Sequence, residues 1–137
     1  MDDKNQMLSL VRQHGYALEH ASDRLKDDKD VVLAAIINSS TSLRFASNRL
    51  RDDIDLVMVT TRHDSWSLEY ASKRLQDDKT LIMAIIGKDG SALKFASDRL
   101  RDDKDVVLTA VRQFGPALQW ASKRLHDDRE CSAFYYR

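Results

Sequence analysis

The residues that most often carry out chemistry are few in this chain of 137 residues, and their spacing does not favour a catalytic site. The histidines, His14, His20, His63 and His126, form no i, i+4 pair on one helix face and no HExxH motif. Cys131 follows His126 by five residues, but no third residue is in place to activate and orient such a pair. The sequence contains no glycine-rich phosphate loop. We therefore predict a protein that is not an enzyme and that uses no cofactor.

Clusters of acidic residues recur in short turns, which read DDKD at 27–30 and at 102–105. Carboxylates at this density can bind calcium, but a calcium site needs six to eight oxygens around one point, usually with a glycine bend and a closing glutamate. These turns provide three carboxylates and no glycine, and an apolar segment follows at once. We predict that the second aspartate of each turn caps a helix and that no metal is bound.

One short sequence, ASDRLKDD at 21–28, returns at equal intervals and with few changes at 46–53, 71–78, 96–103 and 121–128. The structural interpretation is a ladder of Arg–Asp contacts, in which each arginine also covers the aromatic or histidine ring four residues before it. The alternative is a comb of arginines that binds phosphate or carboxylate groups of a partner. The nearby aspartates would repel such a partner, which favours the ladder. The two columns are Arg24, Arg49, Arg74, Arg99 and Arg124, and Asp27, Asp52, Asp77, Asp102 and Asp127.

A fixed period predicts a repeat protein, because each unit is too short to bury a core alone and must stack on its neighbours. We treat 1–137 as a single repeat domain. Its units are 3–27, 28–52, 53–77, 78–102 and 103–127, and a half unit, 128–137, caps the C-terminal end.

Each unit contains two segments with helical patterns. The first begins at an aspartate such as Asp28 and runs through VVLAAII, whose apolar residues cover more than half of a helix, so we expect it to be buried on two sides. The second, of about ten residues, begins after residue 15 or its equivalents and carries an apolar stripe, seen in Leu118, Ala121 and Leu125. We predict an all-α fold, a right-handed α-α hairpin solenoid of five 25-residue repeats plus a C-terminal half-repeat cap.

The composition limits the partners. Lysine plus arginine equals aspartate plus glutamate, at 22 each, which argues against a chain-wide field for nucleic acid or anionic membranes. No apolar run approaches the roughly 20 residues that span a bilayer, and we expect no secretory signal. Because Cys131 is the only cysteine, no internal disulfide can form, and a reducing compartment is expected. We predict a cytoplasmic protein with no membrane partner.

Exposed positions of the second segment vary from unit to unit and form a ribbon of changing charge, where partner specificity can lie. Unit 53–77 departs most from the others, and Trp66 there is a plausible binding anchor. The alternative is that Trp66 packs on a neighbouring hairpin. We expect Trp66, Glu69 and Lys73 to share one helical surface. The predicted partner-binding residues are Trp66, Glu69, Lys73, Lys94 and Arg44.

The pattern DxDVVLxAVxxxGxALxxASxxLxD, clearest at 103–127, resembles tandem short helical repeats of an uncharacterised family, a domain of unknown function found in bacteria, protists and large viruses. The resemblance covers 3–127 and implies no catalytic residue. The function that we expect is a protein-interaction scaffold or adaptor whose partner is another protein. Two alternatives stay open: a phosphate or nucleic-acid binder that uses the arginine column, and a structural or self-assembling spacer.

Overall fold

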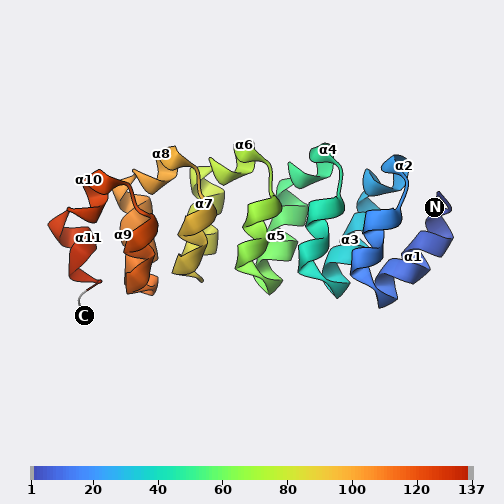
Figure 1. Cartoon of the computed structure of the whole chain (residues 1–137), viewed down its shortest axis with the longest axis horizontal. Coiled ribbons are helices and arrows are strands. Elements are labelled where there is room, and N and C mark those ends of the chain that lie inside the picture. Colours follow the sequence, from blue (N-terminus) through green and yellow to red (C-terminus); the bar gives the residue numbers. More distant parts are fainter. Residues whose placement is uncertain (1, 136–137) are drawn as a thin grey trace. The chain divides into compact units, whose positions relative to one another are not determined.

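The computed structural model describes residues 2–135, which are helical in every repeat and contain no strand (Figure 1). They divide into two compact units, Met1–Ser72 and Lys73–Arg137, and the boundary falls inside the third predicted repeat. Unit 1 contains α1 (Lys4–Gln13), η1 (Gly15–His20), α2 (Asp23–Lys26), α3 (Lys29–Asn38), η2 (Ser40–Phe45), α4 (Asn48–Arg51), α5 (Ile54–His63) and η3 (Ser65–Tyr70), where η marks a 3₁₀ helix. Unit 2 contains α6 (Lys73–Gln76), α7 (Lys79–Ile86), η4 (Gly90–Phe95), α8 (Asp98–Arg101), α9 (Lys104–Gln113), η5 (Gly115–Trp120), α10 (Lys123–His126) and α11 (Arg129–Ala133).

The long helices begin where the acidic turns predict. The Asp28 side chain accepts the main-chain N–H groups of Asp30 and Val31, so it satisfies two of the donors that the first turn leaves unpaired. The equivalent N-caps are Asp3, Asp53, Asp78, Asp103 and Asp128. The predicted capping role of the second aspartate in each turn is therefore confirmed.

The second segment of each repeat differs from the single continuous helix that we expected. A six-residue 3₁₀ helix comes first, two extended residues follow, and a four-residue α-helix completes the repeat. The break occurs at Ala21 and Ser22, whose ψ angles are 156° and 160°. Ser22 then caps the short helix by accepting the N–H of Leu25. A new helix begins at this serine because its hydroxyl can cap a helix, and capping competes with continuation of the preceding helix.

Within each unit the elements form two layers, and every repeat packs on its neighbour in sequence, as in an α-helical repeat solenoid. In unit 1, α1, α3 and α5 contact one another in series, and so do η1, η2 and η3. The core between these layers contains Val32, Ile36 and the fully buried leucines of the 3₁₀ helices, Leu18, Leu43 and Leu68. In unit 2 the equivalent leucines are Leu93 and Leu118. The predicted all-α repeat fold is confirmed.

Glycine begins three 3₁₀ helices, at Gly15, Gly90 and Gly115, and lets the next part of the chain approach closely. A Cβ on Gly15 would lie 2.4 Å from the carbonyl oxygen of Ala35, and a Cβ on Gly90 would lie 2.3 Å from that of Ala110. Ser40 occupies the equivalent place in the second repeat, where Thr60 replaces the alanine and its Oγ1 donates to the Ser40 carbonyl at 2.9 Å. Residue size here is therefore matched between neighbouring repeats.

In unit 2 the predicted cap is present as α11, which buries Cys131 completely. The last two residues of the predicted cap, 136–137, lie outside the described residues.

Candidate protein-docking face

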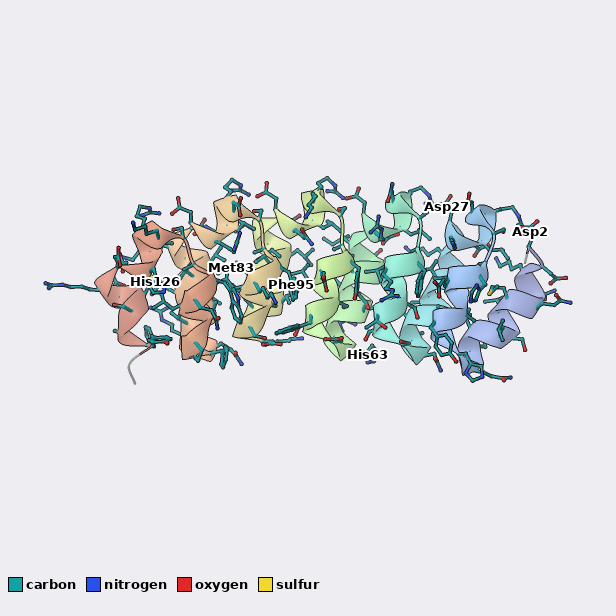
Figure 2. All side chains as sticks on the ribbon, in the orientation of Figure 1. Asp2, Asp27, His63, Met83, Phe95 and His126 are labelled. Carbon is teal, nitrogen blue, oxygen red and sulfur yellow. The ribbon has the colours of Figure 1, made fainter. Side chains whose placement is uncertain are left out.

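The recurring serine, arginine and aspartate residues form one hydrogen-bonded group between successive repeats. At Asp27, which Figure 2 labels, Ser47 Oγ and Arg49 Nε both donate to the carboxylate oxygen Oδ1, at 2.6 and 2.9 Å. Arg49 Nη2 also donates to the main-chain oxygen of Asp27 at 2.7 Å, and Ser47 Oγ accepts the N–H of Leu50. The same serine therefore caps a helix and joins two repeats.

This group recurs with the repeat. The same group is formed by Asp2 with Ser22 and Arg24, by Asp77 with Ser97 and Arg99, and by Asp102 with Ser122 and Arg124. Ser72 Oγ donates to Asp52 at 2.5 Å in unit 1, and Arg74 lies on α6 in unit 2. Asp127 follows the last described serine–arginine pair and makes no ion pair with any residue of 2–135.

The expected stacking of column arginines on rings four residues earlier is wrong at Phe45 and Phe95. The cation over Phe45 is Arg44, at 4.6 Å from the ring centre, and the cation over Phe95 is Lys94, at 5.7 Å. The spacing of four residues brings two side chains together only on a continuous α-helix. The extended alanine and serine between ring and arginine break that helix, and Arg49 and Arg99 turn to aspartates of the preceding repeat instead.

Two carboxylates of the ladder, Asp27 and Asp77, are more acidic than an ordinary aspartate. The pKa of Asp27 is lowered from its ordinary value because Ser47, and after it Arg49, donate hydrogen bonds to the ionised carboxylate. Asp77 has a lowered pKa for the same reason, with Ser97 and Arg99 as donors.

Acid is therefore expected to weaken the stack. Because the folded-state pKa of Asp27 and Asp77 lies below the unfolded value, their contribution to stability is fully present above that value and is lost as the pH falls through the folded pKa. Replacing both aspartates by asparagine should lower the melting temperature at pH 7 and make it fall less steeply between about pH 5 and about pH 2. Thermal melts of both proteins across this range measure the difference. Parallel curves would contradict the assignment.

A second set of ion pairs joins the N-terminal ends of the long helices. Lys4 on α1 lies 3.0 Å from both Asp28 and Asp30 at the start of α3, and these contacts raise the pKa of Lys4. The same pairing links Lys29 to Asp53, Lys79 to Asp103, and Lys104 to Asp128. At the opposite end, Asn38 Nδ2 donates to the carbonyl oxygen of Arg12 at 3.1 Å. N-terminal ends therefore lie beside N-terminal ends, and α1 and α3 run parallel.

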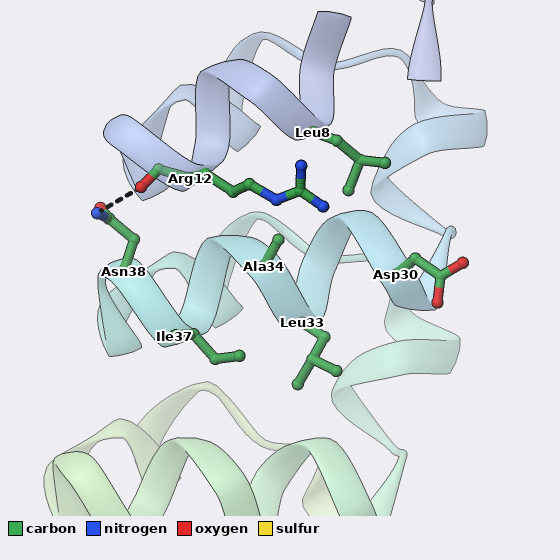
Figure 3. Close-up of a pocket in the computed structure, with 7 residues that line it drawn as sticks. All are labelled: Leu8, Arg12, Asp30, Leu33, Ala34, Ile37 and Asn38. Carbon is green, nitrogen blue, oxygen red and sulfur yellow. Dashed lines mark hydrogen bonds between the residues drawn. The ribbon is translucent and has the colours of Figure 1, made fainter. Parts of the chain in front are cut away.

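An open groove of about 790 Å³ lies on the outer side of α1 and α3 in unit 1 (Figure 3). Leu8, Leu33, Ala34 and Ile37 line it, and the Ile37 side chain is 61% exposed. Arg12 and Asn38 stand at the C-terminal ends of the two helices, and Asp30 stands at the N-terminal end of α3. The groove therefore has an apolar floor between charged ends.

The groove corrects the expected burial of the first helix. Val31, Val32, Ala35 and Ile36 are buried, but Leu33 is half-exposed and faces the groove. Apolar content alone did not distinguish these residues, because an exposed leucine and a core leucine are the same residue type. The signal that could have found the groove is the third row of apolar residues at i, i+4 (Leu33 and Ile37), which the two-layer core does not require.

The residues predicted to bind a partner do not lie on one continuous helix. Trp66, 44% exposed, and Glu69 lie on η3, whereas Lys73 lies on α6, beyond the extended residue Ala71 and in unit 2. The expectation that these three share one helical surface is therefore wrong, because the segment is not a continuous helix. Arg44 on η2 and Lys94 on η4 each lie over the phenylalanine that follows. The binding role of all five residues stays a prediction.

The described residues hold no group of three or more histidine, cysteine, aspartate or glutamate side chains with metal-binding geometry. Burial raises the pKa of the Cys131 thiol, and the Asp128 carboxylate raises it further. At neutral pH this buried sulfur is therefore a thiol, which is a poor nucleophile. Within 2–135, no helix combines the length and the apolar character that a bilayer crossing requires.

Tandem helical repeats whose polar columns join neighbouring repeats define the chain as an α-helical repeat protein. The family model "Domain of unknown function (DUF4116)" matches it three times, over 3–51, 38–76 and 78–126. The chain belongs to this family of tandem repeats. No curated protein and no solved structure matches it.

Proposed function

We propose that the protein is a non-enzymatic protein-interaction scaffold or adaptor that docks another protein on the groove between α1 and α3. The observation that carries this proposal is the exposed apolar floor, above all Ile37, at a position where α1, α5 and α9 carry arginine. A large aliphatic side chain that is 61% exposed within a groove loses contact with water when a partner binds, and that loss favours association.

The geometry of the arginine column favours this function over a phosphate or nucleic-acid binder. Arg24, Arg49, Arg99 and Arg124 each donate through Nε and Nη2 to the preceding repeat. The Nε–Nη2 edge of the guanidinium, which would form a bidentate hydrogen bond with a phosphate, is thus already bound to aspartate. We expect the protein to act in the cytoplasm, where its buried Cys131 stays reduced.

The groove can be tested with a photo-crosslinking residue at position 37 in the native cell, followed by titration of the identified protein with purified material. Replacing Ile37 by arginine, the residue at this position in α1 and α5, should weaken binding at least tenfold, or about 1.4 kcal/mol, because an apolar contact is replaced by a charge. Since neighbouring repeats accept arginine here, the melting temperature should change little.

Trp66 provides the comparison, because it is the predicted anchor on the 3₁₀-helix layer. The groove assignment would be contradicted if position 66 crosslinks to the partner and position 37 does not. In that case Trp66→Ala should lose affinity and Ile37→Arg should keep it, and the docking surface would be the variable ribbon.

A further inference from the structure

The groove is part of a wider face of unit 1, on the side of the long helices that points away from the 3₁₀ layer. Each long helix presents four positions there, spaced i, i+3, i+4 and i+7, which lie on one side of an α-helix. We call this surface the α face. Its residues are Asn5, Leu8, Ser9 and Arg12 on α1, Asp30, Leu33, Ala34 and Ile37 on α3, and Asp55, Met58, Val59 and Arg62 on α5.

The α face has a charge polarity. Its N-terminal edge carries Asp30 and Asp55, whose side chains are 76% and 83% exposed and lie 3.0 and 3.8 Å from the lysines Lys4 and Lys29. Its C-terminal edge carries Arg12 and Arg62, which are exposed and form no ion pair with any described residue. The middle is filled by half-exposed apolar side chains and by the exposed Ser9. Each pair of neighbouring long helices therefore has at least one acid at its N-terminal edge and one arginine at its C-terminal edge.

Unit 2, taken by itself, repeats this order of charge. Asp105 and Glu130 lie at the N-terminal ends of α9 and α11, and Arg112 lies at the C-terminal end of α9. Met83 on α7, which is half-buried, occupies the apolar row between the acidic and basic positions. Among the long helices, α5 and α9 therefore each carry an acid and an arginine at the two ends of this face, whereas the corresponding residues of α7 are Thr80 and Gly87.

We propose that the occupant of the α face is a second copy of this chain, docked face to face with its long helices antiparallel to those of the first. This inference rests on the part of the proposed function that makes the groove a docking surface, and it names a second copy of the chain, in place of a different protein, as the molecule that fills it.

The charge polarity selects this arrangement. When two copies of the face meet about a two-fold axis that crosses the long helices, the acidic edge of each copy lies against the basic edge of the other. Arg62 then approaches Asp55 of the second copy, and the reverse pair forms by symmetry. If the helices ran parallel, acid would face acid and arginine would face arginine, and like charges across an interface oppose binding.

Two further properties fit a second copy. The formal net charge of the chain is zero, so no long-range repulsion separates two copies. A different partner would have to present apolar side chains between an acidic and a basic edge in order to match this face. A second copy of the chain already presents that arrangement.

The size of the face sets the expected strength. Three helices about 15 Å long and about 10 Å apart cover roughly 450 Å², which is less than the roughly 800 Å² per partner of a stable complex. We therefore expect a reversible dimer with a dissociation constant between about 10 µM and about 1 mM, seen as a mass that rises with concentration in sedimentation equilibrium.

Charge reversal of one edge at a time tests the geometry. An acidic-edge variant, Asp30→Lys with Asp55→Lys, and a basic-edge variant, Arg12→Glu with Arg62→Glu, should each dimerise at least tenfold more weakly than the natural protein. An equimolar mixture of the two should form a heterodimer, because the first variant has two basic edges and the second two acidic edges. The helix caps are Asp28 and Asp53, so helix starts are preserved, and melting curves check the fold.

The matched control is Glu19→Lys with Asp23→Lys, which changes the net charge as much as the acidic-edge variant but lies outside the α face, and its dimerisation should equal that of the natural chain. A natural protein that stays monomeric at about 1 mM, or edge variants that dimerise as well as it does, would overturn the proposal. If the chain is monomeric but position 37 crosslinks to a different protein with Ile37-dependent affinity, the second copy is excluded and the proposed function stands. If neither dimer nor partner depends on the face, both proposals fail.

Discussion

Replacing Gly90 by alanine is expected to lower the free energy of unfolding by about 2–3 kcal/mol, although its φ angle is one that alanine adopts freely. The reason is space, because the new Cβ would lie 2.3 Å from the carbonyl oxygen of Ala110 and 3.1 Å from the Cβ of Phe114. Two main-chain segments would have to separate. That movement would also disturb the hydrogen bonds of Gln113, which accepts from the N–H of Gly90 at 2.8 Å and donates to the Lys88 carbonyl at 2.9 Å.

The control for this prediction is Gly87→Ala. Gly87 is exposed, has helical backbone angles, and a Cβ there would meet only the carbonyls of Met83, at 3.1 Å, and Ala84, at 3.8 Å. Alanine also reduces the freedom of the unfolded chain, so this variant should be neutral or more stable by up to about 1 kcal/mol. Urea unfolding of both variants measures the difference. If Gly90→Ala and Gly87→Ala are equally stable, the main-chain segments at Gly90 can separate without a loss of unfolding free energy. The close approach at Gly90 would then not contribute to stability.

The period of the sequence was sufficient to predict the repeat fold and its helix starts. An aspartate before an apolar run has one favourable use, which is to cap the first turn, and Asp28 and its equivalents do so in each repeat. The leucine stripe of the second segment was also correct, since Leu18, Leu43, Leu68, Leu93 and Leu118 are almost completely buried. Such contacts follow from local spacing, and local spacing is visible in a sequence.

The break in the second segment was less visible, because it depends on a partner in the preceding repeat. Ser47 adopts an extended conformation readily because hydrogen bonds replace those of a helix. Its Oγ donates to the Asp27 carboxylate and accepts the Leu50 N–H, and its own N–H donates to the Lys26 carbonyl at 2.9 Å. Helical spacing alone treats this serine as a small residue within a helix. The joint recurrence of the serine and of the aspartate one repeat earlier was the available signal, and it has meaning only when the stacking of repeats is known.

The candidate docking site was missed for a different reason. Sequence reasoning assigned specificity to the variable 3₁₀ layer and counted Leu33 with the core, since apolar residues are usually buried. Which side of an apolar helix stays open depends on how many layers the repeat builds, and a repeat as short as this one builds two. The charged ends of the groove, Arg12 and Asp30, lie on different helices in successive repeats, so their common surface exists only after α1 and α3 pack in parallel.

Replacing Leu43 by alanine is expected to cost about 2–5 kcal/mol of unfolding free energy, the largest loss that we expect from a single substitution in unit 1. Leu43 is fully buried on η2, which contacts α3, α5 and the 3₁₀ helices on both sides. Removal of its branched end would leave a cavity that several helices cannot close together. A 3₁₀ helix of six residues is not stable alone, so the contacts of this leucine hold the segment in place.

The matched control is Leu33→Ala, the same substitution on the α face. Leu33 is half-exposed in the groove, so truncation opens no closed cavity, and the expected loss is about 1 kcal/mol or less. The two variants should separate stability from association, because Leu43→Ala lowers the urea midpoint and Leu33→Ala mainly weakens whatever binds in the groove. A loss of stability in Leu33→Ala as large as in Leu43→Ala would place Leu33 in the core and remove the apolar floor on which the docking face depends.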